Sequence, residues 1–225
     1  MSFNVVSANL PFLIQGLLIT LKVAFISVIL SMTLGTLLGI IRFLKTPVLS
    51  QVVGVFIDVT RSIPLILYII FVHFTISPYI YPYANFLRYI GIDCLEMYSA
   101  IVAIVAFSSA YIAEIIRSGL VSVDENQILA AKALGLNRFQ LLESVVLPQA
   151  LSRMRPALCA QIITLIKDTS LASAIGLIEL KRASEIVYET SFHEFQVLAF
   201  VALVYVSINF LVQRIFYPRG YLLKA

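Results

Sequence analysis

The sequence predicts an all-α integral membrane protein with about five transmembrane helices. Hydrophobic residues make up 60% of the 225-residue chain and charged residues only 12%, whereas a soluble domain carries about 25% charged residues. The mean hydropathy is +0.98, and the few charged residues leave long uncharged runs between them. These observations exclude a water-soluble enzyme, an intrinsically disordered chain and a conventional nucleic-acid-binding protein.

The uncharged runs set the expected positions of the membrane helices. A helix that crosses a bilayer needs about 20 mostly apolar residues. Asp58, Arg61 and Pro64 divide the second run, so residues 48–60 alternatively lie along the membrane interface while 62–77 cross it. Gly35 and Gly39 form a GxxxG pair, which predicts close packing of the first helix within the bundle. The expected crossings are residues 12–42, 48–77, 97–119, 156–178 and 194–216, and residues 1–225 are expected to form a single transmembrane domain.

The distribution of basic residues predicts the orientation of the chain. Five crossings place the two termini on opposite sides of the membrane. One side holds only Arg88, Lys181 and Arg182. The positive-inside rule therefore places the N-terminus outside and the C-terminus in the cytoplasm. The expected cytoplasmic basic residues are Arg42, Lys45, Arg117, Lys132, Arg138, Arg153, Arg155, Arg214, Arg219 and Lys224.

Residues 123–147 predict a cytoplasmic helical hairpin. Asp124 with Gln127 three residues later suggests a variant capping box, and Gly135 suits the end of the first helix. Asn137 can cap a second helix, which Pro148 is expected to stop. The hairpin has too few apolar residues to cross a bilayer, yet too many on one face to remain solvated. We expect it either to lie at the membrane interface or to dock into another protein.

Four motifs follow one another along the chain. The hairpin contains Asn126–Gly135 (NQILAAKALG) followed by Val146–Ala150 (VLPQA). The spacing of Ala-Ala, Gly and Leu-Pro resembles the EAA loop of bacterial ABC-transporter permeases. The resemblance extends from about residue 16 to about residue 215. Three further segments resemble the polar amino-acid uptake branch of that family, the histidine/arginine/glutamine type, and these are Arg61–Leu65, Tyr111–Arg117 and Lys167–Leu171.

This resemblance implies a type I ABC importer-like fold, with the hairpin at about 124–147 acting as the coupling helix in a cleft of an ATPase subunit. Two positions depart from the family pattern. Asn126 replaces the usual Gly, and Leu129 replaces the Glu of Glu-Ala-Ala, while Gly135 is retained. A specialised partner, or a heterodimeric mate that keeps the Glu, would accommodate Leu129. The resemblance assigns coupling to Asn126, Gln127, Ala130, Ala131, Gly135 and Leu136.

Lys167 and Asp168 lie near the middle of the fourth expected crossing. Each charge costs about 2.5–3.5 kcal/mol at the centre of a membrane helix. Consecutive helical residues point about 100° apart, so each charge needs its own partner, which is another helix, water or a ligand. A zwitterionic amino acid offers both charges, and Thr169 and Ser170 add hydroxyl groups. The resemblance places this segment near the translocation pathway; direct substrate contact and a purely structural polar network both stay open.

Two further charge pairs have helical spacing. Asp58 with Arg61, and Glu114 with Arg117, stand three residues apart and can pair on one helix face. Structural closure or gating is expected for both pairs, and Arg61 and Glu114 remain additional candidates for the substrate pathway. No catalytic residue and no metal site is predicted. Cys94 and Cys159 are expected to be apolar fillers.

The chain contains no G-x-x-x-x-G-K-[ST] phosphate loop, so ATP hydrolysis is expected in a separate subunit. The resemblance implies a permease subunit, not an enzyme, of an ATP-driven importer for polar amino acids in the bacterial inner membrane. The implied partners are two ATP-binding subunits that hold ATP and Mg²⁺, a second permease subunit, a periplasmic or lipid-anchored amino-acid-binding protein, and the bilayer. No cofactor in this chain and no nucleic acid are expected.

Two alternatives are open on sequence grounds. An ion-coupled secondary transporter of small polar solutes would use the same intramembrane charges without an ATPase. A small intramembrane enzyme would need a reactive cluster, and none is visible. The hairpin discriminates among them, because only the ATP-driven importer requires it to bind a partner.

Overall fold

The computed structural model describes residues 4–89, 91–92 and 94–216, without the side chains of residues 84 and 87. Arg219 and Lys224, which contribute to the predicted orientation, lie outside the described residues. Contacts divide the chain into two compact units. Unit 1 comprises Met1–Leu30, Ile63–Phe107 and Ile162–Ala225, and unit 2 comprises Ser31–Ser62 and Ser108–Gln161. The expected single transmembrane domain stays a prediction.

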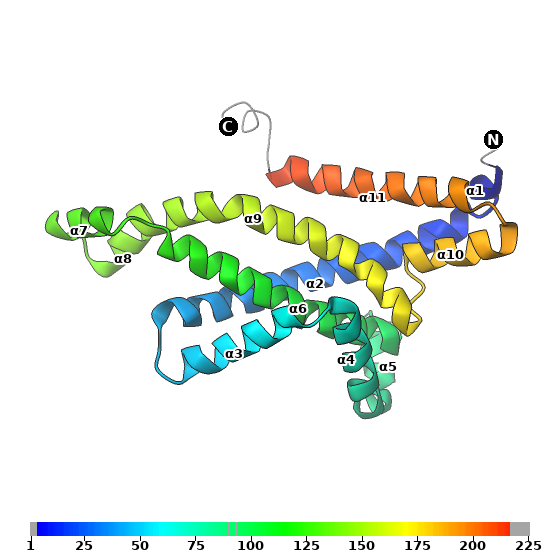
Figure 1. The fold of residues 1–225 in the computed structure, drawn as a ribbon, viewed down its shortest axis with the longest axis horizontal. Helices are drawn as coiled ribbons and strands as arrows, with labels where there is room; N and C mark the ends of the chain where they lie inside the picture. The colour runs from blue at the N-terminus through cyan, green and yellow to red at the C-terminus, as the bar shows by residue number, and fades with distance from the viewer. Residues whose placement is uncertain (1–3, 90, 93, 217–225) are drawn as a thin grey trace. The chain divides into compact units, whose positions relative to one another are not determined.

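All regular secondary structure in the described residues is helical (Figure 1). The α-helices are α1 (Asn4–Ala8), α2 (Leu10–Leu44), α3 (Leu49–Ser62), α4 (Leu65–Ile80), α5 (Ala84–Tyr89), α6 (Leu95–Val121), α7 (Glu125–Ala133), α8 (Arg138–Leu141), α9 (Leu147–Asp168), α10 (Leu180–Ser191) and α11 (Glu194–Phe216). Two 3₁₀ segments, η1 (Tyr81–Tyr83) and η3 (Thr169–Ile175), and one π-helical turn, η2 (Leu142–Val146), complete the set.

Five helical stretches within the described residues are long and apolar enough to cross a membrane, which confirms the predicted number. The second differs from the single helix expected over 48–77 and agrees with the alternative, in which this run is divided near Pro64; the interfacial position of residues 48–60 stays a prediction. α3 ends at Ser62, because Pro64 disfavours helical geometry in the residue before it. Pro64 itself has extended backbone (φ −58°, ψ 133°) and precedes α4. The stretches are Leu10–Leu44, Leu65–Tyr83, Leu95–Val121, Arg138–Ile175 and Glu194–Phe216.

The fourth stretch begins earlier than predicted, because Pro148 does not stop the helix. α8 continues through the π-helical turn into α9, and the Leu147 amide donates to the Leu142 carbonyl, five residues back. A proline ring clashes with the carbonyl four residues before it and removes one hydrogen bond. The wider π turn accommodates both effects; π-helical geometry is rare and occurs mostly as such single turns within α-helices.

Unit 1 contains two apolar clusters. The first joins the N-terminal part of α2 with α4, α6 and the end of α9, and its buried members include Val23, Ile69, Ile104 and Leu165. The second joins α1, α2, α10 and α11 through residues that include Leu13, Val187 and Val197. The outer face of α11 leaves Leu203, Phe210 and Ile215 exposed, as expected for a surface that faces lipid or another subunit.

Unit 2 is held together by close packing of the C-terminal part of α2 against α6. A Cβ atom at Gly35 would lie 2.7 Å from the Cβ of Ile112, and one at Gly39 would lie 2.7 Å from the carbonyl oxygen of Ala113. The GxxxG pair therefore packs within the unit as predicted. α3 adds an amphipathic face that buries Val53 and Ile57 against α6.

Candidate functional site

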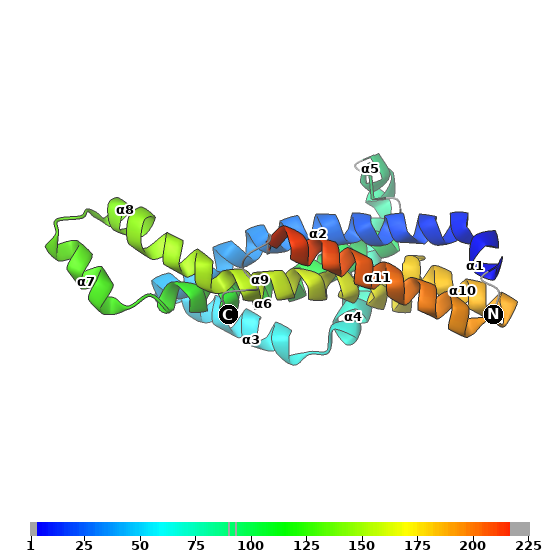
Figure 2. The ribbon, with the colours of Figure 1, turned by 90° about the horizontal axis from the view of Figure 1, so that it is seen from above.

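The hairpin of unit 2 consists of α7 and α8 and connects α6 to α9 (Figure 2). The Asp124 side chain accepts a hydrogen bond from the Asn126 amide (2.8 Å), which confirms it as the N-cap of α7. The predicted reciprocal bond from Gln127 is wrong. The Gln127 side chain instead accepts from the side chain of Gln149, and so links α7 to the start of α9.

The turn between α7 and α8 depends on Gly135. Its φ is +83°, and the Leu136 amide donates to the Ala131 carbonyl (3.2 Å) in the pattern that ends many helices. Asn137 then forms a complete capping box with Gln140, with three bonds of 3.0 Å. The predicted positions of Gly135 at the end of α7 and of Asn137 as the cap of α8 are therefore confirmed. A left-handed residue followed by a capping box fixes the path of the chain through the turn.

The outer surface of the hairpin is more apolar than a solvated loop. Leu129, Leu134 and Phe139 are 54%, 82% and 72% exposed. A hollow of about 360 Å³ lies beside the turn, lined by Leu134, Gly135, Leu136, Gln140 and Ser144. Of the residues assigned to coupling, Asn126, Gln127, Ala130 and Gly135 are exposed, Leu136 is half-buried and Ala131 is buried. The hairpin thus presents both its backbone turn and large apolar side chains at its surface.

A polar cluster in unit 2 lies around Glu114. Arg117 Nη2 lies 2.8 Å from Glu114 Oε2, which confirms the predicted pair. Arg42 Nε lies 3.9 Å from Glu114 Oε1, and Arg42 Nη1 donates to the Ser50 carbonyl (3.3 Å). Sequence reasoning missed Arg42, because helical spacing identifies pairs within one helix and not pairs between helices.

Arg61 does not pair with Asp58. Its guanidinium lies instead 5.0 Å from the ring centroid of Tyr111, where a cation is attracted to the aromatic face. Arg61 and Glu114 line one cavity of about 420 Å³ in unit 2, so the structure brings these two predicted pathway residues together. The cavity is lined by Arg61, Tyr111, Glu114, Ile115, Ser118, Gly119, Ser122, Arg153, Met154 and Ala157.

The Lys167–Ser170 segment lies in unit 1, where α9 changes to the 3₁₀ segment η3 after Asp168. Lys167 is exposed and Asp168 is half-buried. Within the described residues neither side chain forms an ion pair. The hydroxyls of Thr169 and Ser170 donate to the Ile166 and Lys167 carbonyls (2.7 Å each). Thr169 is fully buried, so of the two hydroxyls only that of Ser170 is partly open to a ligand. It offers acceptor lone pairs, because its proton is already donated to the Lys167 carbonyl.

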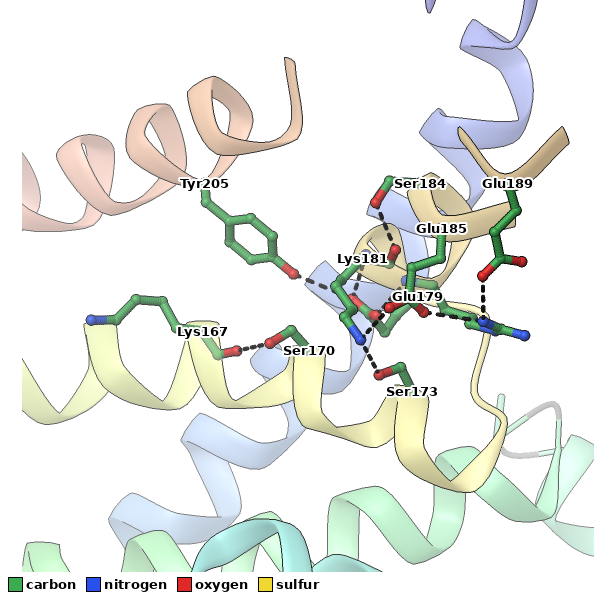
Figure 3. Close-up of polar contacts among 10 residues, drawn as sticks. Lys167, Ser170, Ser173, Glu179, Lys181, Ser184, Glu185, Glu189 and Tyr205 are labelled. Carbon is green, nitrogen blue, oxygen red and sulfur yellow. Dashed lines mark hydrogen bonds and ion pairs between the residues drawn. The ribbon is translucent and has the colours of Figure 1, made fainter. Parts of the chain in front are cut away.

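A buried carboxylate in unit 1 was missed by sequence reasoning. Glu179 is fully buried and caps α10 by accepting from the amides of Lys181 and Arg182 (2.9 Å each). It also accepts from the hydroxyls of Thr20 (3.3 Å) and Tyr205 (3.2 Å), and Figure 3 shows Tyr205 reaching it from α11. One carboxylate therefore connects α2, α10 and α11. Glu is not among the preferred N-cap residues, which is why the sequence pattern gave no signal.

A partly exposed face of α10 carries a network of charges (Figure 3). Lys181 Nζ lies 2.6 Å from Glu185 Oε1 and donates to Ser173 Oγ (3.1 Å). Arg182 Nη1 lies 3.2 Å from Glu185 Oε2 and 3.8 Å from Glu189 Oε1. Burial opposes ionisation of Glu185, but the hydrogen bonds and charges of Lys181 and Arg182 outweigh it and lower the pKa of this carboxyl.

Burial raises the pKa of the Glu179 carboxyl, although its hydrogen bonds, first those from the Lys181 and Arg182 amides, partly oppose the rise. The folded state therefore holds this proton more tightly than the unfolded state. Its contribution to stability is complete below about pH 4.3 and declines as the pH rises through the folded pKa. Glu179→Gln keeps one side-chain oxygen that can accept from an α10 amide and removes the titrating carboxyl, so it should remove this decline. Thermal unfolding midpoints measured from about pH 4 to pH 8 test this expectation. Glu189→Gln, which removes an exposed carboxylate on α10, is the control and should keep the pH profile of the wild type. A wild-type pH profile in Glu179→Gln would contradict the expectation.

Comparison with known proteins assigns the family. Residues 31–219 match the family described as the binding-protein-dependent transport system inner membrane component. The chain belongs to this family. It is 42% identical over 205 residues to the probable glutamine ABC transporter permease protein GlnP of Bacillus subtilis (strain 168), covering 90% of this chain and 89% of that protein. It is 31% identical over 201 residues to the glutamate/aspartate import permease protein GltK of Escherichia coli O157:H7, covering 89% and 88%.

Solved structures show the same fold. A crystal structure of an amino acid ABC transporter with histidines matches with a TM-score of 0.79 and 26% identity over 96% of both chains. An inward-facing MetNI methionine ABC transporter matches with a TM-score of 0.68 over 96% of this chain and 98% of that one. At 22% identity the second match concerns the fold alone. The expected type I ABC importer-like fold is confirmed.

Family membership decides between the alternatives. The chain is a membrane-spanning permease subunit of an ABC transporter in the inner membrane, and it is a transport subunit, not an enzyme. Permeases of this family work with an ATP-binding subunit and another permease subunit. The ion-coupled secondary transporter and the intramembrane enzyme are therefore set aside.

Proposed function

We propose that this chain is the permease subunit of an ATP-driven importer that moves polar amino acids across the bacterial inner membrane. The observation that carries the proposal is the 42% identity to a probable glutamine permease over 90% of the chain. Another relative is named as a glutamate/aspartate import permease, and the structural neighbour is an amino acid transporter. All three names agree on small, polar, zwitterionic cargo.

The proposed assembly contains a second permease subunit, identical or related, and two ATP-binding subunits that hold ATP and Mg²⁺. A periplasmic or lipid-anchored binding protein delivers the amino acid. The N-terminus lies outside and the C-terminus in the cytoplasm, so the α7–α8 hairpin faces the ATP-binding subunit. Its exposed turn supports this role, with Asn126, Gln127, Ala130, Ala131, Gly135 and Leu136 at the contact.

Lys167, Asp168, Thr169 and Ser170 are the proposed contacts of the amino acid along the pathway. The exposed Lys167 and the half-buried Asp168 offer one charge of each sign. In unit 2, Arg61 and Glu114 line a cavity that already contains an ion pair to Glu114. These two residues suit gating of the pathway better than recognition of the cargo, because the Glu114 carboxylate is already bonded to Arg117.

Asp168→Asn tests the pathway. The substitution keeps the size of the side chain but removes the charge that would attract the substrate's ammonium group. We expect ATP-driven uptake of glutamine into proteoliposomes to fall about tenfold, equivalent to ~1.4 kcal/mol, while ATP hydrolysis continues. Asp58→Asn, which removes an exposed carboxylate on α3, should leave uptake unchanged. Full uptake by Asp168→Asn would assign Asp168 to a structural network.

A further inference from the structure

The change from α-helix to 3₁₀ helix after Asp168 aligns polar side chains in a row. A 3₁₀ helix has about 3 residues per turn, so side chains three positions apart lie one above the other. Thr169 and Ala172 form a row that is fully buried. Lys167, Ser170 and Ser173 follow the same spacing on another face, where Lys167 is exposed and the two serines are half-buried. Figure 3 shows these three residues along one side of the segment.

The row formed by Lys167, Ser170 and Ser173 ends at α10. Lys181 Nζ donates to Ser173 Oγ (3.1 Å) and pairs with Glu185 Oε1 (2.6 Å). The start of α10 is fixed in place, because Glu179 caps it and binds Thr20 of α2 and Tyr205 of α11. A Cβ atom at Gly16 of α2 would lie 2.8 Å from the Cβ of Ala183, so α10 also packs closely on α2. Lys181 and Glu185 are therefore held at a defined end of the row.

The row thus connects two places that each present one ammonium and one carboxylate group. Lys167 and Asp168 form the first and Lys181 and Glu185 the second, with the hydroxyls of Ser170 and Ser173 between them. We infer that Lys181 and Glu185 form a second binding position for the zwitterionic amino acid, in which Lys181 binds its carboxylate and Glu185 its ammonium group. This inference rests on the proposed function.

The existing ion pair does not prevent this binding. The Lys181 side chain is 44% exposed and that of Glu185 18% exposed, so the pair is partly open to solvent, where an ion pair contributes less than a buried one. An amino acid that brings both charges replaces one pair by two charge-assisted hydrogen bonds. Arg182 also faces Glu185 (3.2 Å) and Glu189 (3.8 Å). Arg182 shares the charge network of Lys181, but in the described part of the chain its guanidinium does not bond to Ser173, and so it provides a matched control.

The test uses the permease with its ATP-binding subunit in proteoliposomes, supplied with one unchanged binding protein. Lys181→Gln should lower glutamine uptake about tenfold, as expected for the loss of one charge-assisted hydrogen bond, with the ATPase rate retained. Lys181→Arg should restore most of it. Arg182→Gln should stay within about twofold of wild type, because an exposed ion pair contributes little.

Uptake ratios separate recognition from a structural role. Lys181→Gln removes a positive charge, so the negative charge of Glu185 should raise the uptake of arginine relative to that of glutamine. Glu185→Gln removes a negative charge and should raise the uptake of glutamate relative to that of glutamine. The double variant, neutral at both positions, covers the case in which a single variant does not assemble, and should lower glutamine uptake without either shift in ratio. Equal effects of Lys181→Gln and Arg182→Gln, or wild-type uptake by Lys181→Gln, would overturn the inference alone. Wild-type vesicles that accumulate none of these amino acids would overturn the proposed function as well.

Discussion

Gly135→Val is expected to uncouple ATP hydrolysis from transport. Gly135 has a φ of +83°, and apart from its own neighbours along the chain no described atom lies within 4 Å of the position that a Cβ would take. The substitution therefore acts through the backbone, because a β-branched residue in this region is strained by about 1–3 kcal/mol. The strain is relieved when the turn opens and α7 separates from the Asn137 capping box. We expect ATP-driven uptake to fall at least about tenfold, since ~1.4 kcal/mol corresponds to that factor.

Gly135→Asn provides the matched control. Asn adopts the left-handed conformation more readily than other residues and also occurs at this position of helix ends. It adds a side chain to the same open space but leaves the turn intact. Uptake close to wild type in Gly135→Asn, with loss in Gly135→Val, would locate the effect in the backbone. Tight coupling in both variants would contradict the role assigned to the hairpin.

Glu179→Ala is expected to destabilise unit 1. The substitution removes the cap of α10 and leaves the amides of Lys181 and Arg182 without their acceptor. Loss of an N-cap together with its amide bonds typically costs about 1 kcal/mol, and one buried polar group left unpaired adds about 1–3 kcal/mol. We therefore expect the free energy of unfolding to fall by about 2–4 kcal/mol, as measured by sodium dodecyl sulfate titration of the detergent-solubilised protein.

The control for Glu179 is Ser184→Ala. Ser184 is also fully buried on α10, but its hydroxyl donates only to the carbonyl of Lys181 within the same helix. Its removal should cost well under half as much. If both variants unfold at the same detergent fraction, Glu179 does not connect the three helices energetically. Tyr205→Phe should give an intermediate loss, because it removes a single bond to the carboxylate.

Features set by local sequence were predictable. Apolar runs identified the five membrane stretches, because hydropathy depends on composition alone. Gly135 and Asn137 were identified from their preferred places at helix ends, and Glu114 with Arg117 from helical spacing. The GxxxG pair correctly indicated close packing. Each of these signals is contained within one element or one turn.

Features that depend on tertiary contacts, or on whether one helix continues into the next, were not predictable. The sequence indicated a helix stop at Pro148, whereas the π-helical turn carries the helix through it. Arg42 joins Glu114 from another helix. Glu179 is an unusual cap that acquires its importance from Thr20 and Tyr205, both distant in sequence. The alignment of Ser170 with Ser173 requires 3₁₀ geometry, which hydrophobic periodicity did not indicate.

The measurement that tests the central claim most directly is affinity purification of the tagged chain from its native membrane in mild detergent, with subunit ratios determined by mass spectrometry. The α7–α8 hairpin predicts recovery of a P-loop ATPase at one copy per permease chain, and loss of that subunit in Gly135→Val but not in Gly135→Asn. A chain that purifies without any ATPase in several detergents would contradict its role as the permease of an ATP-driven importer.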